Sequence, residues 1–134
     1  MLKLEIPVRI FEKMLEHAKA ETPIEACGIL AGKNQRIEKF YPMTNIDQSS
    51  GHFMMDAKEQ FAVVKNIRAA GLEMLAIYHS HPRTPARPSA EDIKLALTPD
   101  VIYVIVSLRD LNNPAIEGFL LNDGKIQKVP VKIL

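Results

Sequence analysis

The stretch Ile77-Tyr78-His79-Ser80-His81-Pro82, followed by Ser89-Ala90-Glu91-Asp92, holds two histidines two positions apart and a carboxylate eleven positions after the second. The residues before the histidines, from Glu73 to Tyr78, have the apolar character of a buried strand. Residues i and i+2 of a strand point to the same face, so the two imidazoles can converge on one point. Asp92 would lie in the first turn of the next helix, from which its carboxylate could reach back toward them.

This donor set has the composition of a catalytic zinc site. Two neutral imidazoles and one carboxylate leave the fourth position of a tetrahedral Zn²⁺ open for water, whereas a structural site fills all four. A hydrolytic site also needs a base that is not itself a ligand, and Glu25, in Glu25-Ala26-Cys27-Gly28-Ile29-Leu30-Ala31-Gly32, is a candidate. Partial burial at the mouth of an apolar strand would raise its pKa toward neutrality, which suits a base.

Each of these residues also has an ordinary structural interpretation. A histidine near a strand end is commonly a surface or hydrogen-bonded residue, and Glu25 alone could be an unremarkable surface acid. Ser89 with an acid three positions later resembles a helix capping box, and this interpretation is compatible with a functional role. The complete set, in this order along the chain, is what favours a metal site.

The complete pattern resembles the signature of the JAMM (MPN+) zinc metalloproteases. In this chain the pattern consists of Glu25, His79-Ser80-His81-Pro82 and Ser89-Ala90-Glu91-Asp92, without a substitution. The segment Glu-x-Cys-Gly-Ile-Leu-x-Gly that begins at Glu25 looks like the prokaryotic branch of that family. Thr44-Asn45, followed by Phe53 and Asp56, fits the segment before the second helix of such proteins.

The resemblance implies a fold, a metal and a set of residue roles. The implied fold is α/β, a single MPN (JAB1/MPN, cytidine-deaminase-like) domain over residues 1–134, with a mixed central β-sheet flanked by about three helices. His79, His81 and Asp92 would bind one Zn²⁺ per chain. Glu25 would activate the attacking water as general base, and Ser89 would donate a hydrogen bond to the oxyanion of the tetrahedral intermediate.

The resemblance also implies a class of substrate. Members of the family cleave peptide or isopeptide bonds at the C-terminus of ubiquitin-like proteins, and prokaryotic members are similar to enzymes that process sulfur-carrier proteins. The expected reaction is therefore hydrolysis after the C-terminal Gly-Gly of such a partner, for example with release of cysteine or a peptide. The short loop Leu111-Asn112-Asn113-Pro114 stands where eukaryotic ubiquitin-chain-specific relatives carry a longer insertion, so it does not favour chain-linkage specificity.

Other functions fit parts of the pattern. Two histidines and a carboxylate also form the triad of iron(II) oxygenases, in which Glu25 and Ser89 have no necessary role. A non-catalytic MPN-type scaffold typically lacks one or more ligands, and all of them are present here. A zinc nucleoside deaminase would need a Pro-Cys-x-x-Cys pair, which the sequence lacks. Cys27 could be a nucleophile, although a small buried strand residue is the favoured interpretation.

Bulk properties set limits on these functions. A chain of 134 residues suits one domain, and 47% hydrophobic residues suffice for a core. A net charge of +1 gives no general electrostatic case for nucleic acid as a partner. We expect no transmembrane helix, because no run of 18 apolar residues occurs, and no signal peptide. These features, with a single cysteine, favour the cytoplasm; the oligomeric state is left open.

The remaining pattern predicts alternating strands and helices. We expect helices from Pro7 onward, over Ala57–Ala70 and over Ser89–Leu97, with Phe61, Val64 and Ile67 on one apolar side of the second. Expected strands are Leu2–Ile6, Cys27–Ala31, Ile37–Met43, His52–Met55, Leu75–His79 and Val101–Leu108. A terminal hairpin of Ile116–Leu121 and Ile126–Ile133 is expected around Asp123-Gly124.

Overall fold

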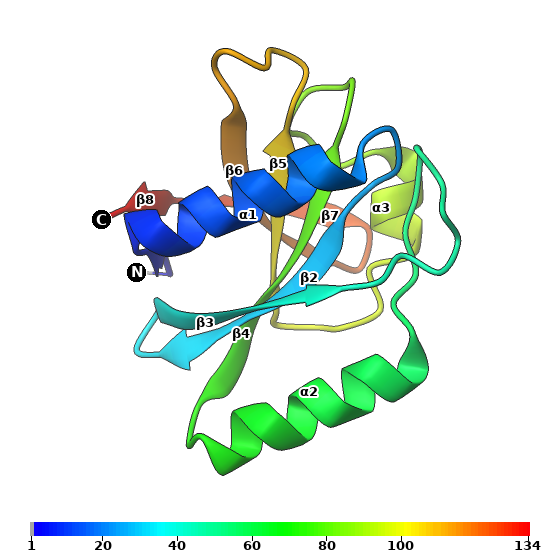
Figure 1. The fold of residues 1–134 in the computed structure, drawn as a ribbon. Helices are drawn as coiled ribbons and strands as arrows, with labels where there is room; N and C mark the ends of the chain where they lie inside the picture. Colours follow the sequence, from blue (N-terminus) through cyan, green and yellow to red (C-terminus); the bar gives the residue numbers. More distant parts are fainter. Residues whose placement is uncertain (1) are drawn as a thin grey trace.

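A computed structural model of the chain describes residues 2–134, which form one mixed eight-stranded sheet and three helices (Figure 1). The strands lie in the spatial order β7-β6-β5-β4-β2-β3-β1-β8. Their bounds are β1 (Leu4–Ile6), β2 (Cys27–Lys33), β3 (Arg36–Met43), β4 (Glu73–His81), β5 (Ile102–Ser107), β6 (Ala115–Asn122), β7 (Lys125–Val129) and β8 (Val131–Ile133). The helices are α1 (Val8–Glu21), α2 (Ala57–Ala69) and α3 (Ala90–Lys94). The expected α/β class, with a mixed sheet and three helices, is confirmed.

Strand β4 lies in the middle of the sheet, antiparallel to β2 and parallel to β5. Every residue of β5 is buried, as the apolar run predicted, and so are the last six residues of β4. Because side chains alternate along a strand, Tyr78 faces one side of the sheet and its neighbours His79 and His81 face the other. The histidine-bearing strand is thus longer than expected and includes both histidines.

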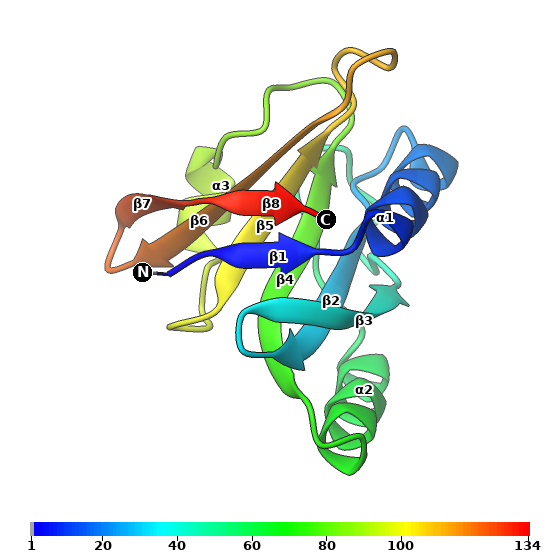
Figure 2. The same ribbon diagram turned by 90° about the vertical axis from the view of Figure 1, so that its left-hand side faces the viewer.

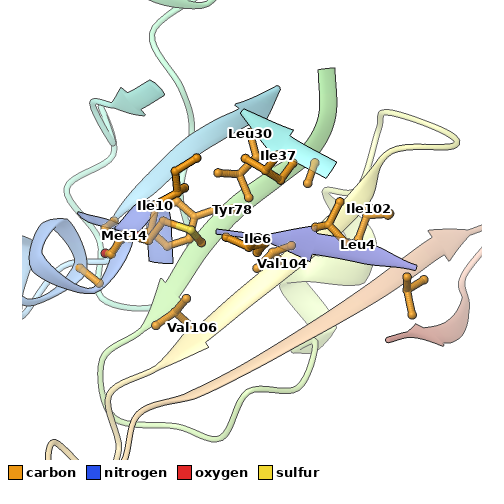
Figure 3. Close-up of a cluster of buried hydrophobic side chains, with 14 of the residues drawn as sticks. Leu4, Ile6, Ile10, Met14, Leu30, Ile37, Tyr78, Ile102, Val104 and Val106 are labelled. Carbon is orange, nitrogen blue, oxygen red and sulfur yellow. The ribbon is translucent and has the colours of Figure 1, made fainter. Parts of the chain in front are cut away.

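One face of the sheet is covered by α1 and by the short strands β1 and β8. Figure 2 shows β1 and β8 crossing in front of the central strands, so the curled end of the sheet closes over its own middle. Between the two lies the main hydrophobic cluster, in which the apolar face of α1 meets β1 and alternate residues of β4 and β5 (Figure 3). Its labelled members are Leu4, Ile6, Ile10, Met14, Leu30, Ile37, Tyr78, Ile102, Val104 and Val106.

The opposite face carries α2, α3 and the segment between β3 and α2. Here Ile77 and Ile105 pack with apolar residues that include Phe53 and Ile93. A second cluster around Ile29 and Ile67 also includes Phe53. None of the helices among residues 2–134 has the length and apolar character needed to cross a membrane.

The C-terminal hairpin differs from the expectation in its second half. Strands β6 and β7 pair antiparallel around Asp123 and Gly124, whose positive φ angles of 54° and 74° suit the expected tight turn. The chain then breaks at Pro130, and β8 pairs in parallel with β1 at the other end of the sheet. A single strand over Ile126–Ile133 was therefore wrong, and the proline, which lacks an N–H for the strand ladder, marks the break.

Three further expectations were wrong in detail. Phe61 is 64% exposed and lies beneath the Lys65 ammonium at 4.7 Å, and Ile67 is the buried residue of α2, so that helix presents a narrower face than its pattern predicted. The third helix ends at Lys94, with Leu95 as its C-cap, and is therefore shorter than the expected Ser89–Leu97. The segment 52–55 forms one isolated bridge, Asn45 to Met55, in place of a strand.

Candidate metal centre

The three residues predicted to be ligands meet on the face of the sheet that carries α3. His79 and His81 end β4, and their Nε2 atoms lie 3.2 Å apart. The Asp92 carboxylate approaches from α3, with Oδ1 3.2 Å from His79 Nε2 and Oδ2 3.0 Å from His81 Nε2. All three side chains are buried, and their donor atoms lie within 4.8 Å of one another. Residues from two separate elements thus form one compact donor set.

The first turn of α3 fixes the position of Asp92. Ser89 caps the helix, with its Oγ accepting from the Asp92 N–H at 3.0 Å, while Asp92 Oδ2 accepts from the Ser89 N–H at 2.9 Å. This is the capping box that the sequence predicted, and it turns the carboxylate toward the histidines. Burial raises the pKa of Asp92, but its hydrogen bonds with both imidazoles and with the Ser89 N–H outweigh burial and hold that pKa well below its usual range.

The hydrogen bonds around His81 indicate that a cation belongs in this donor set. His81 Nδ1 donates to the Pro85 carbonyl at 2.8 Å, so Nε2 of a neutral imidazole carries a lone pair. That lone pair would face the Asp92 carboxylate at 3.0 Å, which is repulsive unless a proton or a metal ion lies between them. Burial lowers the pKa of His81, but its hydrogen bonds with Asp92 and Pro85 outweigh burial and raise that pKa, so they favour a proton at this position. A divalent metal would satisfy all three donors at once.

Glu25 reaches the centre because β2 and β4 run antiparallel. Cys27 pairs with His79, so the residue two positions before Cys27 lies beside His81. Ser80 fastens this segment to β4, because its N–H donates to the Ala26 carbonyl at 2.9 Å and its Oγ accepts from the Ala26 N–H at 2.8 Å. Ser80 is a positioning residue that the sequence reasoning missed, although a serine between two candidate ligands was a signal for it.

The Glu25 carboxyl is buried and lies outside the group of converging donor atoms. It is 3% exposed, and Oε1 has no hydrogen-bond partner among residues 2–134. Burial raises the pKa of Glu25 to about 8; the nearby His81 lowers it and Asp92 raises it further. A buried polar atom without a partner is costly, and such atoms in folded proteins point to a catalytic or ligand-binding role.

Aromatic and apolar side chains close the centre beside His79. The Phe53 ring stacks on the His79 imidazole, with the centroids 4.8 Å apart and the planes inclined at 25°. Both residues line a cavity of about 10 Å³, whose other lining residues are His52, Asp92, Leu95 and Tyr103. The space next to the donor set is therefore narrow.

Cys27 behaves as a structural residue. It is fully buried, and burial, with smaller contributions from Glu59, Glu21 and Glu25, raises the pKa of its thiol to about 12. The thiol is thus protonated at neutral pH, whereas the thiolate is the reactive form. This supports the structural interpretation over the nucleophilic one.

The sequence of the whole chain is similar to those of known proteins. The sequence profile described as "Prokaryotic homologs of the JAB domain" matches residues 7–119. The "CysO-cysteine peptidase" of Mycobacterium tuberculosis is 38% identical over 133 residues, which cover 98% of this chain and 91% of that protein. The "Probable TtuB-protein conjugate cleaving protease" of Thermus thermophilus is 34% identical over 134 residues, covering 99% of this chain and 84% of that protein.

The fold of the chain is also similar to those of solved structures. A solution structure of a protein from Desulfitobacterium hafniense superposes with a TM-score of 0.90 at 40% sequence identity, covering 98% of this chain and 92% of that one. A crystal structure of a JAB1/MPN domain protein from Archaeoglobus fulgidus has a TM-score of 0.63 at 21% identity, covering 96% of this chain and 97% of that one. The second likeness concerns the fold alone, and it agrees with the MPN fold expected from the sequence.

Proposed function

Because this chain belongs to the prokaryotic JAB (JAMM) family of metallopeptidases, we propose that it hydrolyses the bond after the C-terminal Gly-Gly of a ubiquitin-like or sulfur-carrier protein. The observation that carries the proposal is a buried His-His-Asp donor set beside Glu25, whose buried Oε1 has no hydrogen-bond partner within residues 2–134. A binding scaffold has no need of that combination. An iron(II) oxygenase would use the same three ligands but would leave Glu25 without a role.

We assign one Zn²⁺ per chain to His79, His81 and Asp92. Two imidazoles and one carboxylate match the three protein ligands of catalytic zinc sites, which keep a fourth position open. When bound, zinc supplies Lewis-acid polarisation of the scissile carbonyl and lowers the pKa of water. All three donors are buried, and the low dielectric around them strengthens the electrostatic interactions within the site.

Glu25 acts in this proposal as the general base. Its carboxylate accepts a proton from the attacking water and later passes that proton to the leaving amine. In the metal-free chain the pKa of Glu25 is raised to about 8, and the charge of a bound cation would lower it toward neutrality, where a carboxylate can both accept and return a proton. The two hydrogen bonds between Ser80 and Ala26 fix the backbone next to Glu25 against the strand that carries the histidines.

Ser89 stabilises the oxyanion. Its Oγ already accepts from the Asp92 N–H, so its hydroxyl proton is free to be donated to a substrate oxygen. The helix cap thus sets the direction of the donor as well as that of the Asp92 ligand. Such a bond strengthens as negative charge develops in the transition state, which is where it accelerates the reaction.

Replacing Ser89 with alanine should lower kcat by about 10²-fold or more, with a smaller change in KM, as loss of an oxyanion donor does. The variant also loses its helix cap, which costs about 0.5–2 kcal/mol of stability. Asp56→Ala is the matched control, because Asp56 caps α2 by accepting from the Glu59 N–H at 3.1 Å. Steady-state kinetics with thermal melts separate the two effects. A Ser89→Ala enzyme with wild-type kcat would place the oxyanion donor elsewhere.

The class of substrate follows from the family and from the narrowness of the site. The names of the two relatives describe CysO-cysteine and TtuB–protein conjugates as what those proteins cleave. The cavity beside His79 and Asp92 is about 10 Å³, so a slender chain suits this approach. Two glycines let a tail bring its backbone close to the ligands without side-chain clashes.

The experiment that tests the proposal is a mass-spectrometric cleavage assay. We expect the zinc-loaded protein to cleave carrier–cysteine and carrier–peptide fusions that end in Gly-Gly before the bond. Changing the penultimate glycine of the tail to phenylalanine should remove most of the turnover. Equal cleavage of both tails would contradict a narrow channel. Failure to cleave any Gly-Gly adduct by a zinc-loaded protein would favour a binding scaffold instead.

A further inference from the structure

Asn45 is a buried polar residue that the proposed mechanism leaves without a role. It is 2% exposed and makes four hydrogen bonds to backbone groups. Its Nδ2 donates to the carbonyls of Glu25 at 3.0 Å and His52 at 3.1 Å. Its Oδ1 accepts from the N–H groups of Asp47 and Met54, both at 3.1 Å. Four bonds use the full capacity of an asparagine amide, so this side chain is fixed in one orientation.

Two of these partners lie directly on either side of Phe53. The amide holds the His52 carbonyl before it and the Met54 N–H after it, and the Ile46 N–H donates to the Met54 carbonyl at 2.9 Å. These bonds explain why the segment is not a strand, since its backbone groups pair with a side chain. They also set the position of the Phe53 ring, which stacks on His79.

The two candidate histidine ligands are oriented by different means. His81 donates Nδ1–H to the Pro85 carbonyl, which is the usual way in which a ligand imidazole is held. His79 Nδ1 has no hydrogen-bond partner within residues 2–134. At its other nitrogen, Nε2, His79 contacts Asp92 and His81, and the face of its ring stacks on Phe53 at 4.8 Å and 25°.

We propose that Asn45 and Phe53 form one positioning unit, in which the Asn45 amide fixes Phe53 and the Phe53 ring orients His79 for metal binding in place of a hydrogen-bond acceptor. The same amide holds the Glu25 carbonyl, and the Glu25 N–H donates to the Ser49 carbonyl of the same segment at 2.9 Å. One segment between β3 and α2 therefore aligns the ligand with the base. Neither Asn45 nor Phe53 contacts the reacting atoms. This inference rests on the proposed metal site.

Zinc affinity of Phe53 variants tests the stacking step. Phe53→Leu keeps an apolar side chain but removes the aromatic face, and we expect it to weaken zinc binding by about 10–100-fold, as loss of an outer-shell partner does. Phe53→Tyr restores the ring and should return the affinity to near the wild-type value. Phe61→Leu is the matched control, because Phe61 is exposed on α2, and it should change nothing. Affinity is measured on metal-stripped protein by competition for Zn²⁺ with a chromogenic chelator.

The visible absorption spectrum of Co²⁺-substituted protein gives a second readout that a packing role would not move. Phe53→Leu should change this spectrum, and Phe53→Tyr should restore it. If Phe53→Leu keeps both the wild-type zinc affinity and the wild-type spectrum while melting earlier, Phe53 only fills space and the proposal is overturned. If wild-type protein itself binds no zinc, the proposed metal site is wrong. That result differs from the one that would contradict the role of Phe53 alone.

Asn45→Asp tests the link between the two residues. The carboxylate has the shape of the amide but lacks the donors that hold the Glu25 and His52 carbonyls. We expect weaker zinc binding and the same spectral change as in Phe53→Leu, and this variant also serves as the test if Phe53→Leu does not fold. In the double variant the loss should stay near that of the stronger single variant, because both residues act through one ring. Fully additive losses would overturn the single unit.

Discussion

A Glu25→Gln protein should lose hydrolytic activity by about 10²–10⁴-fold, the usual contribution of general acid–base catalysis, while it keeps its zinc. The amide has nearly the shape of the carboxyl group but cannot accept a proton from the attacking water. Zinc should stay bound because Glu25 lies outside the group of atoms formed by His79, His81 and Asp92. The replacement should also leave the fold intact, because Glu25 Oε1 accepts no hydrogen bond from any residue between 2 and 134.

The measurement pairs turnover of a carrier–cysteine fusion with metal analysis of the same protein sample. Glu38→Gln is the matched control, since Glu38 is an exposed acid on β3, and it should retain both activity and metal. Undiminished turnover in Glu25→Gln would remove Glu25 from the mechanism. A Glu25→Gln protein that has lost its zinc would identify Glu25 as a ligand, and the division of roles proposed here would be wrong.

The arrangement of site residues that lie close together in the sequence could be predicted from the sequence. His79 and His81 share a face because strand geometry requires it, and the Ser89–Asp92 cap turns the carboxylate toward them because the capping box has a fixed geometry. Both arguments use spacings of two or three residues. The position of Glu25 beside the ligands depends on the register in which Cys27 pairs with His79, between two strands far apart in the chain. Strand geometry alone does not predict this pairing, and Glu25 was selected from its resemblance to the family motif.

The parts that the sequence analysis missed depend on side chains that replace regular structure. His52–Met55 has an apolar pattern compatible with a strand, but the buried Asn45 amide occupies backbone groups on both sides of Phe53. The sequence does not tell whether an asparagine is exposed or holds four hydrogen bonds in the interior. The break of the last strand at Pro130 was easier to predict, because a residue without an N–H rarely continues a strand ladder.

For α2 the sequence predicted the helix correctly but not the width of its buried face. Its pattern correctly predicted the helix, and Asp56 caps it by accepting from the Glu59 N–H. How much of an amphipathic face is covered depends on the neighbours. Among the described residues the helix packs on β3 and β4 at one side, with Ile67 buried and Phe61 exposed. Hydrophobic periodicity gives the direction of a face but not its width.

Replacing His81 with alanine should reduce zinc affinity by several orders of magnitude, the largest effect that we expect on metal binding. The variant removes one of three protein donors and also the bond from Nδ1 to the Pro85 carbonyl in the Pro82–Pro88 loop. Asp92 would then keep a single imidazole partner, His79, at 3.2 Å. A buried carboxylate with fewer partners is itself destabilising, so the metal-free variant should melt earlier than metal-free wild-type protein.

Thermal unfolding with and without chelator gives a clear measurement of this loss. Zinc held at about a hundred times its dissociation constant adds about 2.7 kcal/mol to the stability of a protein that binds it only when folded. Wild-type Tm should therefore fall when EDTA is added, and His81→Ala should show no such difference. His17→Ala is the matched control, because His17 lies near the Tyr78 hydroxyl at 3.3 Å, on the other face of the sheet, and should keep the EDTA response. Asp92→Asn, which is nearly isosteric, should lose that response as well. A His81→Ala protein with undiminished zinc and a full EDTA response would reject the ligand assignment, because a site with only His79 and Asp92 cannot hold the ion as three donors do.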